Sequence, residues 1–370
     1  MLRGIKVKKA EILKLDEKAR MKEEALRKSQ QMLGEDVDRF DRRPGGETLF
    51  SRKSLRERSL SGRVYLITGA TRGIGRGLAR QLLSQGATVA VTARGQVEAV
   101  ALANKLQAES TSRGAAVGFA CELASLASVR ALVSDFRSKH RKLHGLVLNA
   151  GVMACPMGRT IEGFELQFGV NHVAHHMLAR LLSPQLQAAG AGARVVSLAS
   201  SYHDVAYDGS VGHIDFDDLN WEKKSYNPWA AYAQSKLANV LFAREYASRV
   251  KGVTCVSCHP GWVHTSLLRH HMPSGVVACL LPLLKSQGMI SLEDGLEVPL
   301  HCILSDDLEN GGYYEQGNTH MTKLPGGMPS QPRAGGEGTD VVIAAKLWKT
   351  TEALIEKAGA AGSEWSVNSI

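Results

Sequence analysis

From Ser61 onward, short apolar runs alternate with amphipathic stretches, and this alternation restricts the fold more than any other feature of the 370-residue chain. The apolar runs predict strands at 64–68, 88–93, 116–120, 146–149, 195–199 and 253–257. The amphipathic stretches predict helices at 74–85, 96–112, 125–140, 161–188, 229–250 and 341–357. Strands separated by helices of this length require right-handed crossovers and a parallel sheet covered on both sides. The sequence therefore predicts an α/β fold: a single doubly wound, Rossmann-type domain with helices on both faces.

The predicted domain spans residues 61–357, between a charged N-terminal arm and linker at 1–60 and a tail at 358–370. The arm contains 17 Lys and Arg against 11 Asp and Glu, and so carries most of the net charge of +9. The nearly neutral body argues against a nucleic-acid partner. The pattern of residues 5–33 is typical of a solvated helix, with a helix that contacts a partner or a membrane surface as the alternative. Residues 310–340 are rich in Gly and Pro and predict a long irregular segment.

Hydropathy and cysteine usage indicate the compartment. No apolar run approaches the roughly 18 residues of a membrane span, and the N-terminus lacks the apolar core of a secretory signal. The six cysteines show no framework spacing, which is typical of a reducing compartment. We expect a cytoplasmic protein, with peripheral membrane contact through the arm or the apolar segment 266–288 as the alternative.

A glycine-rich turn, Thr68-Gly-Ala-Thr-Arg-Gly-Ile-Gly75, follows the first predicted strand and opens the first predicted helix. Glycines at such a turn let backbone N–H groups approach a pyrophosphate at the helix N-terminus. The strand–turn–helix context therefore predicts a dinucleotide site. Its candidate contacts are Gly69, Thr71, Arg72, Gly73, Ile74 and Gly75.

The end of the second predicted strand indicates which dinucleotide is bound. An NAD enzyme usually has Asp or Glu there, on the ribose 2′-hydroxyl, whereas this chain has Arg94, with Arg72 in the glycine turn. Guanidinium groups bind phosphate in a bidentate manner. We therefore predict NADP(H), the alternative being that both arginines are merely exposed.

Tyr232 and Lys236 lie four residues apart in a predicted helix and so share one of its faces. A tyrosine titrates near 10, so action as a base at neutral pH requires about 4 kcal/mol in favour of the phenolate. A neighbouring ammonium supplies part of that. Ser200 ends the fifth predicted strand. A serine at this position is either a turn residue or a hydrogen-bond donor to a substrate carbonyl oxygen. Asn171 lies inside a predicted helix, where Asn is unfavourable without another role.

The glycine turn, Asn149-Ala-Gly151, Asn171, Ser200, Tyr232-x-x-x-Lys236 and the turn at Pro260-Gly261 together resemble the short-chain dehydrogenase/reductase family, over residues 61–357. Within that family, the sequence most resembles retinol dehydrogenases and the oxidoreductase part of the WW-domain-containing oxidoreductase. The resemblance implies that Tyr232 is the general acid/base, and that Lys236 lowers its pKa and binds the nicotinamide ribose. It implies that Ser200 orients the substrate carbonyl and that the backbone at Asn171 holds a water in the proton relay. Further cofactor contacts implied by the predicted strand ends or by the resemblance are Glu122, Leu123, Asn149, Ala150, Gly151, Pro260, Gly261, Val263 and Thr265.

The expected activity is hydride transfer between NADP(H) and a carbonyl/alcohol pair, with a hydrophobic small-molecule substrate such as a retinoid, steroid or lipid aldehyde. Two alternatives stay open: a reductase for polar carbonyls such as 3-ketoacyl thioesters, and a low-turnover NADP(H)-binding scaffold that uses the basic arm. The resemblance also implies a homo-oligomer. We expect no metal site, because His172, His175 and His176 lack the glutamate of H-E-x-x-H and an evident third ligand.

Overall fold

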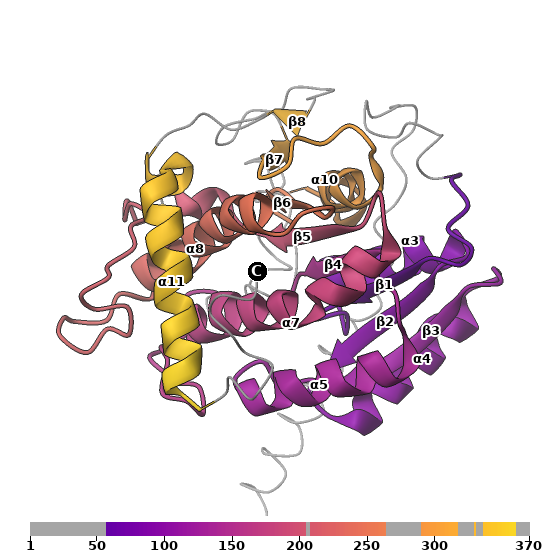
Figure 1. The fold of residues 1–370 in the computed structure, drawn as a ribbon, viewed down its shortest axis with the longest axis horizontal. Helices are drawn as coiled ribbons and strands as arrows, with labels where there is room; N and C mark the ends of the chain where they lie inside the picture. The colour runs from indigo at the N-terminus through magenta and orange to yellow at the C-terminus, as the bar shows by residue number, and fades with distance from the viewer. Residues whose placement is uncertain (1–56, 205–207, 264–289, 317–328, 331–335, 360–370) are drawn as a thin grey trace, which may run out of the picture.

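The computed structural model describes residues 57–204, 208–263, 290–316, 329–330 and 336–359, and contains one mixed sheet at its centre (Figure 1). The strand order is β3-β2-β1-β4-β5-β6-β7-β8, and only the last pair is antiparallel. The strands are β1 (Val64–Ile67), β2 (Thr88–Ala93), β3 (Ala115–Ala120), β4 (Gly145–Leu148), β5 (Arg194–Leu198), β6 (Thr254–Cys258), β7 (Tyr313–Gln316) and β8 (Pro329–Ser330). The order reverses between β1 and β4, and an open α/β sheet binds its ligand at such a point. The predicted doubly wound sheet is confirmed.

Helices cover both faces of this sheet, as the alternation predicts. One face carries α3 (Gly73–Ser84), α4 (Gln96–Glu109) and α10 (Leu292–Leu304). The other carries α5 (Leu126–Lys139), α7 (Ala174–Ala189) and α8 (Pro228–Arg249). A further helix, α11 (Val341–Lys357), packs on α8 as an outer layer (Figure 1). Its Trp348 stacks on Phe242 of α8, with 6.0 Å between the ring centroids and 5° between the planes.

The structure departs from the predicted elements in three places. The single helix predicted over 161–188 is instead a short helix α6 (Leu166–Phe168), a π-helical turn (Gly169–Val173) and then α7. The segment predicted to be irregular contains β7, because its buried tyrosines pair with β6 next to it. Helix α10 is not predicted by the patterns above; it buries Val298, Ile303 and their neighbours under the sheet. Tertiary packing decides each case rather than local pattern.

A buried ion pair fastens α11 to α7. The Glu352 side chain is fully buried and accepts from Arg180 Nε at 2.7 Å and Nη2 at 3.1 Å, and it lies 2.7 Å from His176 Nε2. Burial opposes ionisation of Glu352, but the bonds from His176 and Arg180 outweigh it and hold its pKa below the ordinary value. His172 bonds the same helix through Thr351, at 3.0 Å. These contacts hold α11 against α7 and against the π-helical turn that precedes α7.

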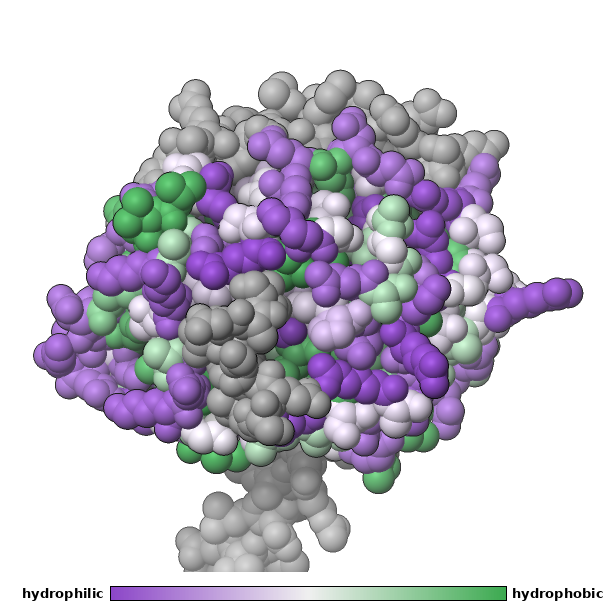
Figure 2. All heavy atoms as spheres, in the orientation of Figure 1, coloured by the Kyte–Doolittle hydropathy of each residue, from purple (hydrophilic) through white to green (hydrophobic). Residues whose placement is uncertain are grey.

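The face of the molecule that carries α11 is largely hydrophilic (Figure 2). An apolar group lies over the start of that helix, where Val341 and Val342 are 61% and 72% exposed. Among the residues that the structure describes, no helix has both the length and the apolarity needed to cross a membrane.

Candidate active site

The carboxyl ends of four parallel strands bring the predicted residues to one edge of the sheet. Thr68 follows β1, Asn149 follows β4, Ser200 lies two residues after β5, and Pro260 lies two residues after β6. Since parallel strands end on the same side, chain segments far apart in sequence meet here. The candidate site is therefore at the edge that the strand-end pattern predicts.

The glycine turn after β1 is built for close backbone approach. Gly69 and Gly73 have φ of +67° and +58°, a region that favours glycine. A Cβ on Gly75 would lie 2.4 Å from Asn149 Nδ2 and 2.6 Å from the Gly69 carbonyl oxygen. Asn149 Nδ2 donates to the carbonyls of Thr68, at 2.8 Å, and Gly69, at 3.1 Å. The first turn of α3 contains no acidic residue, so the positive end of the helix can attract an anion.

The residues predicted to select the cofactor lie at the adjoining end of β2. Arg94, Thr71 and Arg72 are exposed, and the carboxylate of Glu98 accepts from Gly95 N at 3.0 Å, which closes the turn after Arg94. At the next strand end, Glu122 Oε1 accepts from Ala124 N at 3.0 Å. Leu123 beside it is buried. Glu122 thus caps its own loop.

Local sequence fixes the start of the helix that carries Tyr232 and Lys236. Asn227 Oδ1 accepts from Trp229 N at 2.9 Å and from Ala230 N at 3.1 Å, and Pro228 occupies the first helical position. Both residue types are favoured at those positions. The helix then runs for 22 residues, so Tyr232 and Lys236 lie one turn apart and both are buried against the end of β5.

Tyr232, Lys236 and Ser200 form a compact polar group. The Tyr232 hydroxyl bonds the Ser200 side chain, and Lys236 Nζ lies 5.6 Å from the centroid of the Tyr232 ring. Lys236 Nζ donates to the carbonyl of Leu198, the last residue of β5, at 2.9 Å. Burial raises the pKa of Tyr232, and the bond with Ser200 opposes that shift. Burial also lowers the pKa of Lys236 to about 8.

Asn171 joins this group from the π-helical turn. Its amide clamps Val152 in the loop after β4, because Oδ1 accepts from Val152 N at 2.8 Å and Nδ2 donates to Val152 O at 2.9 Å. Nδ2 also donates to Ser235 Oγ at 3.0 Å. A Cβ on Gly151 would lie 3.0 Å from Asn171 Oδ1 and 3.6 Å from Lys236 Nζ, so a larger residue at 151 would crowd both. The structure therefore brings together all four predicted catalytic residues.

An apolar group lies on the other side of Tyr232. Met153 and Ala154 pack with Tyr232, and the partly exposed rings of Tyr202 and Trp229 pack against them. Tyr202 meets Trp229 and Tyr232 edge to face, at centroid distances of 5.4 Å and 6.1 Å. Aromatic side chains of this kind offer a substrate a large apolar contact area.

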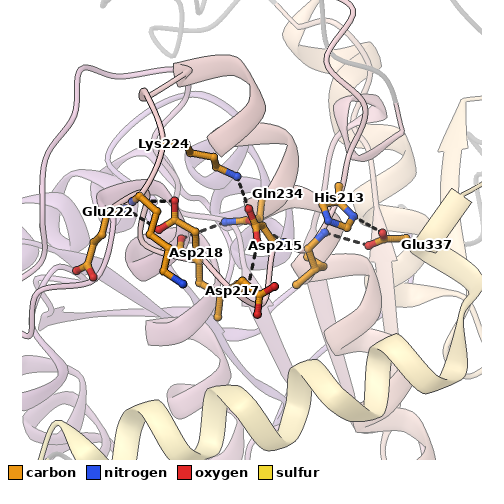
Figure 3. Close-up of polar contacts among 11 residues, drawn as sticks. His213, Asp215, Asp217, Asp218, Glu222, Lys224, Gln234 and Glu337 are labelled. Atoms are coloured by element: carbon orange, nitrogen blue, oxygen red, sulfur yellow. Dashed lines mark hydrogen bonds and ion pairs between the residues drawn. The ribbon is translucent and has the colours of Figure 1, made fainter.

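The strap, which we define as residues 213–224, contacts α8 through Gln234 (Figure 3). Gln234 holds it from two sides: Oε1 accepts from Asp215 N at 3.1 Å and Nε2 donates to Leu219 O at 3.2 Å. Lys224 pairs with Asp215 at 2.5 Å, and Ile214 N donates to Glu337 at 3.0 Å (Figure 3). The ion pair is partly exposed and contributes little, so the amide of Gln234 is the main anchor.

The turn after β6 completes the edge. Gly261 has φ of +93°, and the chain then reaches Val263, which is buried and pairs with Ile290. A Cβ on Gly295 of α10 would lie 2.4 Å from the Val263 side chain, so α10 fixes this turn by close packing. Thr265 and the apolar segment 266–288 lie outside the described residues.

Comparison with known proteins identifies this arrangement. A family model described as short chain dehydrogenase matches residues 63–212. Human retinol dehydrogenase 12 is 39% identical over 259 residues, which cover 69% of this chain and 78% of that protein. The chain belongs to the short-chain dehydrogenase/reductase family. Mouse retinol dehydrogenase 11 is 35% identical over 291 residues, covering 78% of this chain and 85% of that protein, which places the chain in the retinol dehydrogenase subgroup.

A solved structure agrees with this assignment. The crystal structure of an uncharacterised protein from Mycobacterium paratuberculosis superimposes with a TM-score of 0.63 and 29% identity, covering 84% of this chain and 98% of that one. The protein is therefore an oxidoreductase of the short-chain dehydrogenase/reductase family, whose members bind a nicotinamide cofactor.

The roles of two polar residues of this short-chain dehydrogenase are not predicted from the sequence. Thr68 Oγ1 accepts from Asn149 N and Ala150 N, each at 3.0 Å, and thereby joins the glycine turn to the loop after β4. His175 contacts Thr68 from α7. Thr68 could have been found from its place before Gly69, and His175 from its position one turn after Asn171.

Proposed function

We propose that the protein is an NADP(H)-dependent oxidoreductase that interconverts a carbonyl and an alcohol on a hydrophobic substrate. The observation that carries the proposal is the group formed by Ser200, Tyr232 and Lys236 at the edge where the glycine turn lies. A hydroxyl proton donor, a second hydroxyl beside it and an ammonium behind it are the groups that carbonyl reduction requires.

In the reducing direction, the reduced nicotinamide, when bound, supplies the hydride to the carbonyl carbon. Tyr232 donates its proton to the carbonyl oxygen, and the product is the alcohol. Ser200 donates a hydrogen bond to the same oxygen and stabilises its developing charge. The Lys236 ammonium lies 5.6 Å from the centroid of the Tyr232 ring and serves to return a proton to the phenolate. The backbone carbonyl of Asn171 would accept from the relay water that in turn resupplies Lys236 with a proton. Asn171 also keeps the loop at Gly151 in place beside Lys236.

The electrostatics suit Tyr232 as an acid at neutral pH. Burial raises its pKa, so the hydroxyl keeps its proton until a substrate oxygen takes it. Lys236 has a pKa of about 8, so it is largely an ammonium at pH 7 and favours the phenolate left behind. Burial is thus the largest effect on the pKa of Tyr232 and raises it, whereas the resemblance implies that Lys236 lowers this pKa.

The apolar side of the site supports a hydrophobic substrate. Met153, Tyr202 and Trp229 lie against Tyr232, and the relatives described above are named for retinol. We therefore infer that a retinoid-like aldehyde is the substrate class. NADPH oxidation should be faster with retinal than with a steroid ketone, and much faster than with a short acetoacetyl ester. A preference for the ester would favour the polar-carbonyl alternative instead.

The preference for NADP(H) is testable at Arg94. We expect Arg94→Asp to lower the ratio of kcat/KM for NADPH over NADH by about 10- to 100-fold, because a charge-assisted bond to the 2′-phosphate is lost and repulsion replaces it. Arg113→Asp, at another exposed arginine, makes the same change in net charge and should leave the ratio unaltered. An unaltered ratio in Arg94→Asp would show that this guanidinium does not select the cofactor.

A further inference from the structure

A buried histidine outside the predicted catalytic set connects Asn171 with the start of the glycine turn. His175 lies in α7, one helical turn after Asn171, and is 2% exposed. Its Nδ1 is 3.0 Å from the carbonyl oxygen of Asn171, and its Nε2 is 2.9 Å from Thr68 Oγ1. The ring therefore links the π-helical turn that contains Asn171 to Thr68, where the glycine turn begins.

These contacts determine which nitrogen carries the proton. A carbonyl oxygen only accepts, so Nδ1 must be the donor to Asn171. Burial, together with the nearby Lys236 ammonium, lowers the pKa of His175 to about 4, so the ring is neutral at physiological pH. A neutral ring with its proton on Nδ1 has a lone pair on Nε2, which must accept.

Thr68 supplies the complementary donor. Its Oγ1 already accepts from the backbone N–H groups of Asn149 and Ala150. Its single proton has two acceptors within reach, His175 Nε2 at 2.9 Å and Val147 O at 3.4 Å. The shorter contact, with a buried nitrogen that needs a donor, takes the proton. The result is a continuous chain from the loop after β4, through Thr68 and His175, to the Asn171 carbonyl.

We propose that His175 is a positioning residue of the active site, which as its Nδ1–H tautomer fixes the Asn171 carbonyl relative to the glycine turn. The inference rests on the proposed function, since the Asn171 carbonyl matters as the acceptor for the relay water behind Lys236. A carbonyl oxygen has two lone pairs, so the bond from His175 orients the group and the oxygen can accept one further hydrogen bond. The imidazole of His175 thus fixes both the Asn171 carbonyl and the start of the glycine turn.

The neighbouring His172 provides a matched control. His172 is equally buried on the same helical segment, but it bonds Thr351 of α11 instead of the site. His172→Gln should lower the melting temperature and leave kcat unchanged. A loss of kcat at position 175 beyond that of this control is then a positioning effect and not a general effect of removing a buried imidazole.

Two variants with an amide side chain, His175→Asn and His175→Gln, test the two hydrogen bonds of His175 separately. The Asn side chain places its nitrogen as far from the backbone as Nδ1, and the Gln side chain places its terminal atoms as far as Nε2. We expect His175→Asn to keep the donor to Asn171 and to retain kcat within about threefold, while His175→Gln keeps the acceptor for Thr68 and loses about tenfold in kcat at unchanged NADPH affinity. Equal loss of kcat in both variants, or loss only in proportion to unfolded protein, would overturn the proposal.

The tautomer is measured without turnover, by nitrogen NMR of histidine-labelled full-length protein at pH 7, with the His175→Gln spectrum assigning the signal. A neutral ring protonated on Nδ1 is the expected result. A ring protonated on Nε2, or on both nitrogens, would refute the inference whatever the activity. Failure of the proposed function is a different result, namely a wild-type protein that reduces no carbonyl substrate with either nicotinamide cofactor.

Discussion

Replacing Tyr232 by Phe is expected to lower kcat for carbonyl reduction by about 10³-fold, with NADPH affinity little changed. The hydroxyl is the acid that protonates the substrate oxygen, and Phe keeps the ring that packs against Met153 and Tyr202. Steady-state rates with retinal, and NADPH binding followed by its fluorescence, measure the two quantities separately. The fold is expected to persist, because among the described residues the Tyr232 hydroxyl loses only its bond to Ser200.

Tyr246→Phe is the matched control for that variant. Tyr246 lies in the same helix, is fully buried, and shares a hydrogen bond of 2.8 Å with Ser183 Oγ, away from the site. It should cost about 1 kcal/mol of stability and leave kcat unaltered. If Tyr232→Phe kept the wild-type rate, the mechanism proposed above would be wrong. A wild-type protein that binds NADPH without turnover would favour the scaffold alternative.

Replacing Glu352 by Ala should produce the largest loss of stability, about 3–5 kcal/mol in the free energy of unfolding. The change removes the carboxylate from a fully buried pair and leaves the Arg180 guanidinium without that partner inside the protein. Denaturant unfolding followed by circular dichroism measures it. Glu356→Ala, at an exposed position one turn further along α11, should change the free energy by less than about 0.5 kcal/mol.

The same pair predicts the response of stability to acid. The folded-state pKa of Glu352 lies below its ordinary value of 4.5, so the stability it provides is complete above about pH 4.5 and is lost as pH falls through the folded pKa. The wild type should therefore lose stability on acidification more steeply than Glu352→Ala below pH 4.5. Parallel curves for the two proteins would mean that the carboxylate is not held ionised by His176 and Arg180.

Much of the cofactor side of the site is visible in the sequence because it is local. The turn from Thr68 to Gly75 is contiguous, and its glycines are required by a positive φ or by close approach of the backbone. Tyr232 and Lys236 share a face through helical periodicity alone, and Asn227-Pro228 sets the start of their helix. Strand–helix alternation likewise predicts the parallel sheet.

The polar contacts of Asn171 are less local. Its position inside an apolar helical pattern signals a special role, but the π-helical turn and the clamp on Val152 depend on a loop 19 residues earlier in the chain. Gln234 is similar: nothing next to it in sequence shows that its amide holds the strap. In each case the partner is chosen by folding, since an amide can bond any backbone that packing brings to it.

The sequence by itself determined the alternation of strands β1 to β6 with helices, the glycine turn and the spacing of Tyr232 and Lys236, because each is a pattern within a short segment of the chain. Only the tertiary structure decided the protonation of the site: burial raises the pKa of Tyr232, lowers that of Lys236 and makes His175 a neutral link between Asn171 and Thr68. The physical reason is that desolvation and hydrogen-bond partners are properties of the packed environment, which segments distant in sequence create together.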